Sequence, residues 1–144
     1  MVACSLEKSV MAEIIVRENG QGRYQQEVIA GEHWLLADEP VSLGGADAGP
    51  APFDFLLAGL GACTAMTLRM YAERKGLPLT QVSVVLSHDS VSADGVKRDR
   101  FLRRITLHGD LTEEQRARML EIANKCPVHR ALSQSLMIES GLVD

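Results

Sequence analysis

The sequence is poor in aromatic residues and has no excess of positive charge, and both shortages exclude classes of function. Aromatic residues make up 4% of the 144 residues, too few for a platform on which single-stranded bases stack. Fifteen Lys and Arg residues stand against 19 Asp and Glu residues, which gives a formal net charge of -4. Nucleic acids and anionic membranes bind clustered positive charge. We therefore expect neither as a partner.

Long hydrophobic runs and a secretion signal are also missing from the pattern. No apolar run approaches the roughly 20 residues that span a bilayer, and no apolar segment typical of a signal peptide precedes Cys4. We therefore predict a cytoplasmic protein. With 46% hydrophobic and 24% charged residues, the composition is typical of a soluble globular domain. The length predicts one domain over residues 1–144.

The three cysteines do not form a Cys-x-x-Cys pair, which excludes the common zinc-ribbon and thioredoxin patterns. Cys63, Cys126 and His129 would supply three zinc ligands, but no further ligand spacing accompanies them. We predict no bound metal. Cys4 lies near the terminus without a patterned context, and we assign it no role.

The hydrophobic pattern predicts an α+β fold. Alternating residues favour strands over 9–17, 23–30 and 33–37. A long loop over 38–52 follows, and loops of this length are often functional. A helix is then expected from Pro52 to Lys75, because Pro suits a first helical turn and Gly76 a helix end.

The second half of the chain predicts a strand pair, two helices and a closing strand. The expected strands are Gln81–His88 and Phe101–His108, joined by a polar loop over 89–100. A capping box at Thr112 opens a helix to about Lys125, and Pro127 begins a short helix to about Ser133. Leu136–Glu139 is the candidate closing strand. The basic residues between 97 and 104 are interpreted as an exposed hairpin rather than an anion site.

Cys63 belongs to an apolar stripe along the long predicted helix. Residues three or four apart share a helix face, and here they are Phe53, Leu56, Leu60, Cys63, Thr67 and Met70. Small residues around Cys63 leave room for another element or for a reactant to reach the sulfur. A buried structural thiol explains the same pattern.

Cys126 stands directly before Pro127, where the short helix is expected to begin. The positive end of that helix and the neighbouring Lys125, His129 and Arg130 would lower the pKa of the thiol. An ordinary buried cysteine between two helices is the other interpretation. If the two cysteine helices pack together with Cα atoms within about 7 Å, the sulfurs can form a disulfide. A thiolate could then reduce a peroxide, and the second thiol could resolve the sulfenic acid.

Two segments around these cysteines resemble the OsmC/Ohr family. Residues 49–57 and 60–67 resemble its first cysteine helix, and Cys126-Pro127-Val128-His129 resembles its second cysteine motif. The resemblance implies an intertwined homodimer with active sites at the subunit interface. It also implies reduction of organic hydroperoxides to alcohols. In this scheme Cys63 attacks the peroxide, and Cys126 resolves the oxidised Cys63 through an intrasubunit disulfide. The scheme needs no bound cofactor, because an external dithiol or lipoyl-type reductant restores the thiols.

The resemblance further implies an arginine and an acid beside Cys63. Arg17 is our candidate arginine, with Arg23 as the alternative. Asp54 is our candidate acid, with Glu39 as the alternative, because Phe53 occupies the position where better-known family peroxidases carry an acid. The substrate pocket is expected to be lined by Phe53, Leu56, Leu60 and Met70.

A second function remains open on the sequence. The changed acid position is compatible with an OsmC-like module that binds a small apolar or thiol-bearing ligand with little or no turnover. Oxidation of both thiols by an alkyl hydroperoxide would separate the enzyme from the binding module.

Overall fold

The computed structural model describes residues 13–143, which form two compact units divided between Phe55 and Leu56. The mixture of antiparallel strands and three α-helices is the predicted α+β class. Cys4 and the first residues of the strand predicted over 9–17 lie outside the described residues. Each unit is described by itself below.

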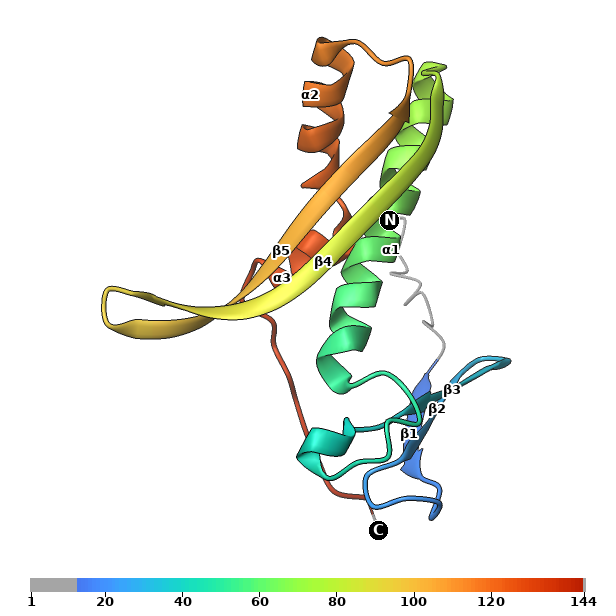
Figure 1. Ribbon diagram of the computed structural model, residues 1–144, viewed down its shortest axis with the longest axis vertical. Helices are drawn as coiled ribbons and strands as arrows, with labels where there is room; N and C mark the ends of the chain where they lie inside the picture. The colour runs from blue at the N-terminus through green and yellow to red at the C-terminus, as the bar shows by residue number, and fades with distance from the viewer. Residues whose placement is uncertain (1–12, 144) are drawn as a thin grey trace, which may run out of the picture. The chain divides into compact units, whose positions relative to one another are not determined.

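The first unit contains a three-stranded antiparallel sheet in the order β1-β2-β3 (Figure 1). Its strands are β1 (Ile14–Glu18), β2 (Gln26–Ala30) and β3 (His33–Ala37). Ile14 pairs with Ala30, and Ala30 pairs with His33 across a tight turn in which Gly31 has a φ of 61°. All three strands were predicted. β2 begins at Gln26 rather than at Arg23.

The loop after β3 is closed around the buried carboxylate of Asp38. Oδ1 of Asp38 accepts the N–H of Glu39 at 2.8 Å, and Oδ2 accepts the N–H groups of Ala46 and Ala48 at 3.1 Å each. These bonds hold the pKa of Asp38 below its usual value, mainly through Ala48 and against the effect of burial. A Cβ at Gly45 would lie 1.9 Å from the carbonyl oxygen of Glu39, so the loop closes only with glycine there.

The helix α1 (Pro52–Lys75) begins and ends at the predicted residues. By length and composition it is apolar enough to cross a membrane, although no such run was predicted from the sequence. One helix of this kind is weak evidence for a membrane span, because the core helix of a globular protein has the same length and composition. Leu68 and Ala72, both fully buried, form part of a core in the second unit.

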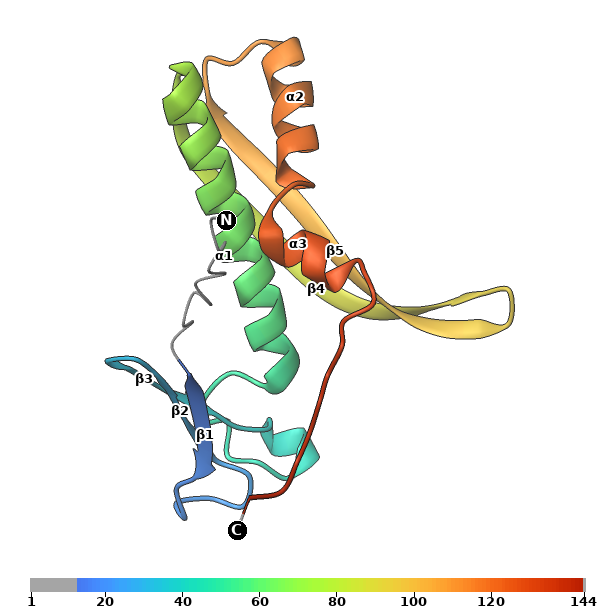
Figure 2. The ribbon, with the colours of Figure 1, turned by 180° about the vertical axis from the view of Figure 1, so that it is seen from behind.

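In the second unit, β4 (Leu79–Ala93) and β5 (Val96–Gly109) form one long antiparallel ribbon. Figures 1 and 2 show α1, α2 (Glu113–Ala123) and α3 (Pro127–Leu132) on one face of this ribbon. The buried core between them consists of Leu68, Ala72, Leu79, Leu111, Met119, Ile122 and Ala123. The capping box at Thr112 is present, because the side chain of Thr112 and the side chain of Gln115 each accept the other residue's backbone N–H.

The polar loop predicted over residues 89–100 is wrong, because both strands of the ribbon continue to a two-residue turn. Asp94 and Gly95 form that turn with φ angles of 52° and 75°, the Asp-Gly combination that favours a tight hairpin. Asp89 pairs with Arg100 at 2.6 Å across the ribbon. Both faces of this distal part are largely solvated, so polar side chains replaced the hydrophobic alternation that predicts a strand.

The closing strand predicted at Leu136–Glu139 is also wrong. Residues 134–143 contain no strand, and the side chains of Met137 and Ile138 are 86% and 85% exposed. A strand needs a partner for its backbone hydrogen bonds, and no strand pairs with these residues in the described part of the chain.

Candidate active site

The start of α3 holds the sulfur of Cys126. This residue caps the helix with extended backbone, and its Sγ accepts the backbone N–H of His129 at 3.2 Å. Pro127 occupies the first helical turn, where its missing N–H costs no hydrogen bond. Cys126 is fully buried within the second unit. The sequence predicted this position before the helix.

The middle of α1 supplies the second sulfur. Cys63 is half-buried, and its side chain lies near enough to Cys126 to lower the pKa of that thiol. The next residue, Thr64, is fully buried and donates its hydroxyl to the carbonyl of Leu60 at 2.7 Å. The oxygen Oγ1 of Thr64 lies 4.0 Å from Sγ of Cys126. The fold thus brings together two free thiols that are 63 positions apart in the sequence.

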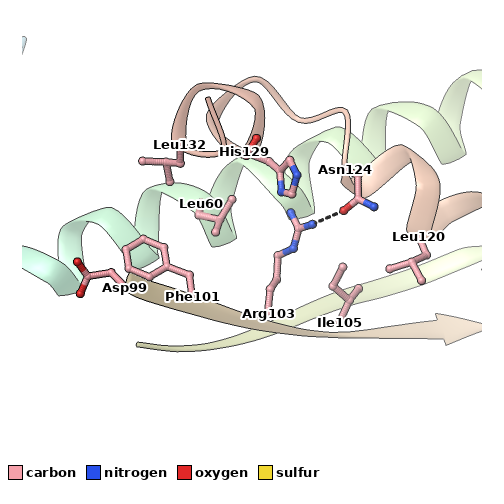
Figure 3. Close-up of a pocket in the computed structure, with 10 residues that line it drawn as sticks. Leu60, Asp99, Phe101, Arg103, Ile105, Leu120, Asn124, His129 and Leu132 are labelled. Atoms are coloured by element: carbon pink, nitrogen blue, oxygen red, sulfur yellow. Dashed lines mark hydrogen bonds between the residues drawn. The ribbon is translucent and has the colours of Figure 1, made fainter. Parts of the chain in front are cut away.

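A guanidinium from β5 connects the elements around these thiols. Nη1 of Arg103 donates to Oγ1 of Thr64 at 2.9 Å and to the carbonyl of Ala123 at 3.2 Å. Its Nη2 donates to Oδ1 of Asn124 at 2.8 Å, as Figure 3 shows. One side chain therefore joins α1, β5 and the junction between α2 and α3.

The surroundings of Cys126 favour its thiolate. Burial raises the pKa of the thiol, but hydrogen bonds from His129, Cys63 and Thr64 and the positive charge of Arg103 lower it, and the net shift is downward. The pKa of His129 is lowered by burial and by the charge of Arg103. His129 is therefore neutral at pH 7.

A cavity of about 490 Å³ lies beside this cluster. Figure 3 shows its walls, which come from α1, β5, α2 and α3. It is lined by Leu60, Asp99, Phe101, Arg103, Ile105, Leu120, Asn124, His129, Leu132 and Ser133. Neither cysteine is among these residues.

Of the four residues predicted to line a substrate pocket, Leu60 lines this cavity. Phe53 and Leu56, near the start of α1, have 44% and 45% of their surfaces exposed. Met70 lines a separate hollow with Met66 and Arg69. Their contact with a substrate stays a prediction.

The predicted arginine and acid lie in the first unit and have local partners there. Nε of Arg17 is 2.9 Å from a carboxylate oxygen of Glu27 across β1 and β2. Arg23, the alternative, lies over the ring of Tyr24. Oδ2 of Asp54 accepts the N–H of Ala51 at 2.9 Å, in the first turn of α1. The assignment of Arg17 and Asp54 to Cys63, with Glu39 as the alternative acid, stays a prediction.

Arg103 was not predicted as a site residue, because its basic neighbours suggested an exposed hairpin. A signal for it was present in the strand periodicity. Phe101, Arg103, Ile105 and Leu107 alternate along β5, and all four are partly buried. A charged residue within such a series faces the core side of the sheet and needs a polar partner there.

Metal-binding groups are not gathered in the described part of the chain. Residues 13–143 hold no group of three or more His, Cys, Asp or Glu side chains that could bind a metal ion. Cys63, Cys126 and His129 lie close together, but the backbone N–H of His129, rather than its ring, makes the contact with sulfur that the structure shows. The absence of a metal stays a prediction.

Comparison with known proteins gives one family and a set of similar folds. The family model for OsmC-like protein matches residues 44–140. Among solved structures, an OsmC-like protein from Mycoplasma pneumoniae is 20% identical with a TM-score of 0.70, over 85% of this chain and 86% of that one. No curated protein sequence matches the chain significantly.

Two further solved structures have the same fold. An organic hydroperoxide resistance protein OsmC from Legionella pneumophila is 20% identical with a TM-score of 0.63, over 83% of this chain and 88% of that one. An organic hydroperoxide resistance protein from Elizabethkingia anophelis is 18% identical with a TM-score of 0.68, over 88% and 90%. At these identities the likeness establishes the fold.

Proposed function

Because the chain belongs to the OsmC-like protein family, we propose that it is a thiol-dependent peroxidase that reduces organic hydroperoxides to alcohols. The observation that carries the proposal is that the half-buried thiol of Cys63 lies near the buried sulfur of Cys126 and lowers its pKa. The names of similar structures from Legionella pneumophila and Elizabethkingia anophelis, both organic hydroperoxide resistance proteins, support the same substrate class.

In the proposed first step Cys63 attacks the peroxide. Cys126, whose pKa is lowered, acts in its thiolate form as the base that takes the proton of the neighbouring Cys63. The Cys63 thiolate then forms a bond to the terminal oxygen of the hydroperoxide, and the O–O bond breaks. The leaving alkoxide takes the proton from Cys126 and departs as the alcohol, which leaves a sulfenic acid on Cys63 and a thiolate on Cys126.

In the second step the Cys126 thiolate attacks the sulfur of Cys63. An intrasubunit disulfide forms, and the hydroxide that leaves is protonated to water. An external dithiol, of the lipoyl type that the family resemblance implies, supplies two electrons and two protons to restore both thiols. The role of Arg103 in this scheme is to favour the thiolate through its charge and to hold Thr64 against the sulfur.

The quaternary structure and the cell compartment belong to the same proposal. We propose an intertwined homodimer in the cytoplasm, with each site at the subunit interface. In such a dimer Arg17 would favour the Cys63 thiolate and Asp54 would orient that arginine. Phe53, Leu56, Leu60 and Met70 would provide apolar surface for an alkyl or fatty-acid hydroperoxide.

A stoichiometric oxidation experiment tests the proposal. Reduced protein is mixed with one equivalent of cumene hydroperoxide or hydrogen peroxide, free thiols are counted over time, and the products are mapped by mass spectrometry. We expect fast loss of two of the three thiols with the organic peroxide and a Cys63–Cys126 disulfide. The variant Cys126→Ser should accumulate a sulfenic acid on Cys63, and Cys63→Ser should react slowly.

The third cysteine provides the matched control, because Cys4→Ser should leave both the rate and the disulfide unchanged. Thiols that persist for minutes with one equivalent of organic peroxide would contradict the proposal. The second candidate, a binding module with little turnover, would then explain the family fold. The 490 Å³ cavity, which neither cysteine lines, favours that candidate.

A further inference from the structure

Arg103 carries a positive charge that no acidic side chain balances. The ion pairs of residues 13–143 are Arg17–Glu27, His88–Asp99, Arg100–Asp89 and Arg118–Glu121. Arg103 is instead held by neutral acceptors, the hydroxyl of Thr64, the carbonyl of Ala123 and the side-chain amide of Asn124. Its charge also lowers the pKa of Cys126, but none of these hydrogen bonds goes to that sulfur, so within the described residues the partly buried guanidinium has no hydrogen-bonded anion. It is therefore suited to bind an anion.

Two N–H groups of the Arg103 guanidinium remain available as hydrogen-bond donors. Three of its five N–H groups, two on Nη1 and one on Nη2, donate to the three neutral acceptors. Nε–H and the second N–H of Nη2 have no acceptor among the described residues. A carboxylate accepts two parallel hydrogen bonds from a guanidinium and is the anion whose shape fits that fork.

The surface next to these donors is mostly apolar. Arg103 stands on the wall of the 490 Å³ cavity, as Figure 3 shows, and this volume lies within the roughly 300–1,000 Å³ of small-molecule sites. Five large apolar side chains line the same cavity: Leu60, Phe101, Ile105, Leu120 and Leu132. The cavity therefore offers a cationic fork together with surface for a hydrocarbon chain.

The other titratable groups on the cavity leave the charge of Arg103 in place. His129 is neutral at pH 7, because burial and the charge of Arg103 lower its pKa. Asp99 is four positions from Arg103 along β5, a separation of about 13 Å in a strand. The carboxylate of Asp99 is also 2.8 Å from Nε2 of His88. Among the residues that line the cavity, an anion at Arg103 thus meets no negative charge nearby; Cys126, whose pKa Arg103 lowers, is not one of them.

We propose that this cavity binds a monocarboxylate with an apolar chain, whose carboxylate bonds to the free N–H groups of Arg103 and whose chain contacts Phe101, Leu120 and their apolar neighbours. This cavity shares only Leu60 with the pocket that the sequence predicts along α1. The inference goes beyond the proposed peroxidase, since binding requires no reaction at either thiol.

The test uses octanoate and octanol, which share a chain and differ in the anionic group. Calorimetric titration of the reduced protein should give at least about tenfold tighter binding of octanoate. Arg103→Gln should remove that preference, whereas Arg104→Gln should keep it. Arg104 is the matched control, because it is the next residue of β5, is exposed and carries the same charge.

The outcomes separate this site from the proposed enzyme. Equal binding of octanoate and octanol to the wild-type protein, or no binding of either, overturns the inference. An unchanged preference in Arg103→Gln overturns it too. If Arg103→Gln does not fold, Arg103→Lys, which keeps the charge but loses the fork, should reduce the preference. Titration of Cys63→Ser, which cannot reduce a peroxide, should match wild type, so failure of the peroxidase leaves this result intact.

Discussion

Thr64 links the charged guanidinium of Arg103 to the thiol of Cys126. Its Oγ1 accepts from Arg103 at 2.9 Å and lies 4.0 Å from the sulfur of Cys126, and its side chain is fully buried. No other side-chain oxygen of the described residues contacts both groups. The properties of the site therefore depend on a residue that carries no charge and does no covalent chemistry.

We predict that Thr64→Val raises the pKa of Cys126 and destabilises the fold. The change removes the hydroxyl that lies 4.0 Å from the sulfur and leaves an N–H of Arg103 without its acceptor, which costs about 1–3 kcal/mol. Thiolate absorbance near neutral pH and urea unfolding measure the two effects. Thr106→Val, an exposed position on β5, should change neither. An unshifted thiol titration in Thr64→Val would argue against the role given to the hydroxyl.

The thiolate of Cys126 should also make stability depend on pH. Its pKa in the folded protein lies below the ordinary value of 9.0. The stabilisation it contributes is absent below the folded pKa, grows as pH rises, and is complete above 9.0. We therefore expect the stability difference between wild type and Cys126→Ser to increase from pH 6 to pH 9 in urea unfolding under reducing conditions. A difference that stays constant or shrinks would contradict the assigned shift.

Cys126, Arg103 and Arg17 show which features of the site could be predicted from the sequence and which could not. The position of Cys126 before a helix was predictable, because Pro127 marks a first turn locally. The partners of Arg103 are 39 and 21 positions away in the sequence, and no local pattern identifies them. Arg17 was chosen by resemblance, and the structure gives it Glu27 as a partner within its own sheet.

At the scale of elements, α1 was predicted with its bounds and the distal ribbon was missed. The ends of α1 are coded by a first-turn Pro and a following Gly, whose effects depend on backbone geometry alone. The ribbon beyond His88 instead depends on cross-strand partners such as Asp89 and Arg100. A pattern that searches for buried faces does not detect a strand pair with two solvated faces.

The loop between β3 and α1 is an element organised by one carboxylate. We predict that Asp38→Asn opens it, because an amide has one acceptor oxygen where the carboxylate uses two for three N–H groups. Hydrogen exchange of the Ala46 and Ala48 amides should accelerate at pH 7. The effect should vanish as pH falls below about 3.8, because the lowered pKa of Asp38 means that its stabilisation is lost only there.

Asp47→Asn is the control for this loop. Asp47 is exposed and has a φ of 52°, a conformation that asparagine tolerates well. It should leave the exchange of both amides unchanged. Equal acceleration in the two variants would show that loss of charge in the loop, rather than the Asp38 hydrogen bonds, controls its closure.

At the scale of the whole molecule, large apolar side chains of both units lie exposed in the described chain. Met66 and Met70 on α1 have 60% and 66% of their surfaces exposed, and Trp34 on β3 has 62%. Large exposed apolar patches mark interaction sites, and the family resemblance implies a homodimer. Light scattering should therefore give twice the 15.7 kDa mass of the chain.

We predict that the double change Met66→Glu with Met70→Glu converts the dimer to a chain of 15.7 kDa, because two buried charges without partners oppose association. Lys75→Glu, at the exposed end of α1, should leave the dimer intact. Circular dichroism checks that each variant folds. A wild-type protein of single-chain mass would contradict the dimer, and a double variant that stays dimeric would place the contact elsewhere.

The joining of α1, β5 and the α2–α3 junction by Arg103 has a consequence for the newly made chain. The loops closed by its bonds to Thr64 and Asn124 span 39 and 21 positions, and contacts so distant in sequence form late in folding. Until then Cys126 lacks its neighbouring cation and its contacts with α1 and keeps only the local hydrogen bond from the N–H of His129, so its pKa is closer to its ordinary value. The nascent chain therefore carries weakly nucleophilic thiols, and the thiolate develops only when folding has placed the correct partner beside it.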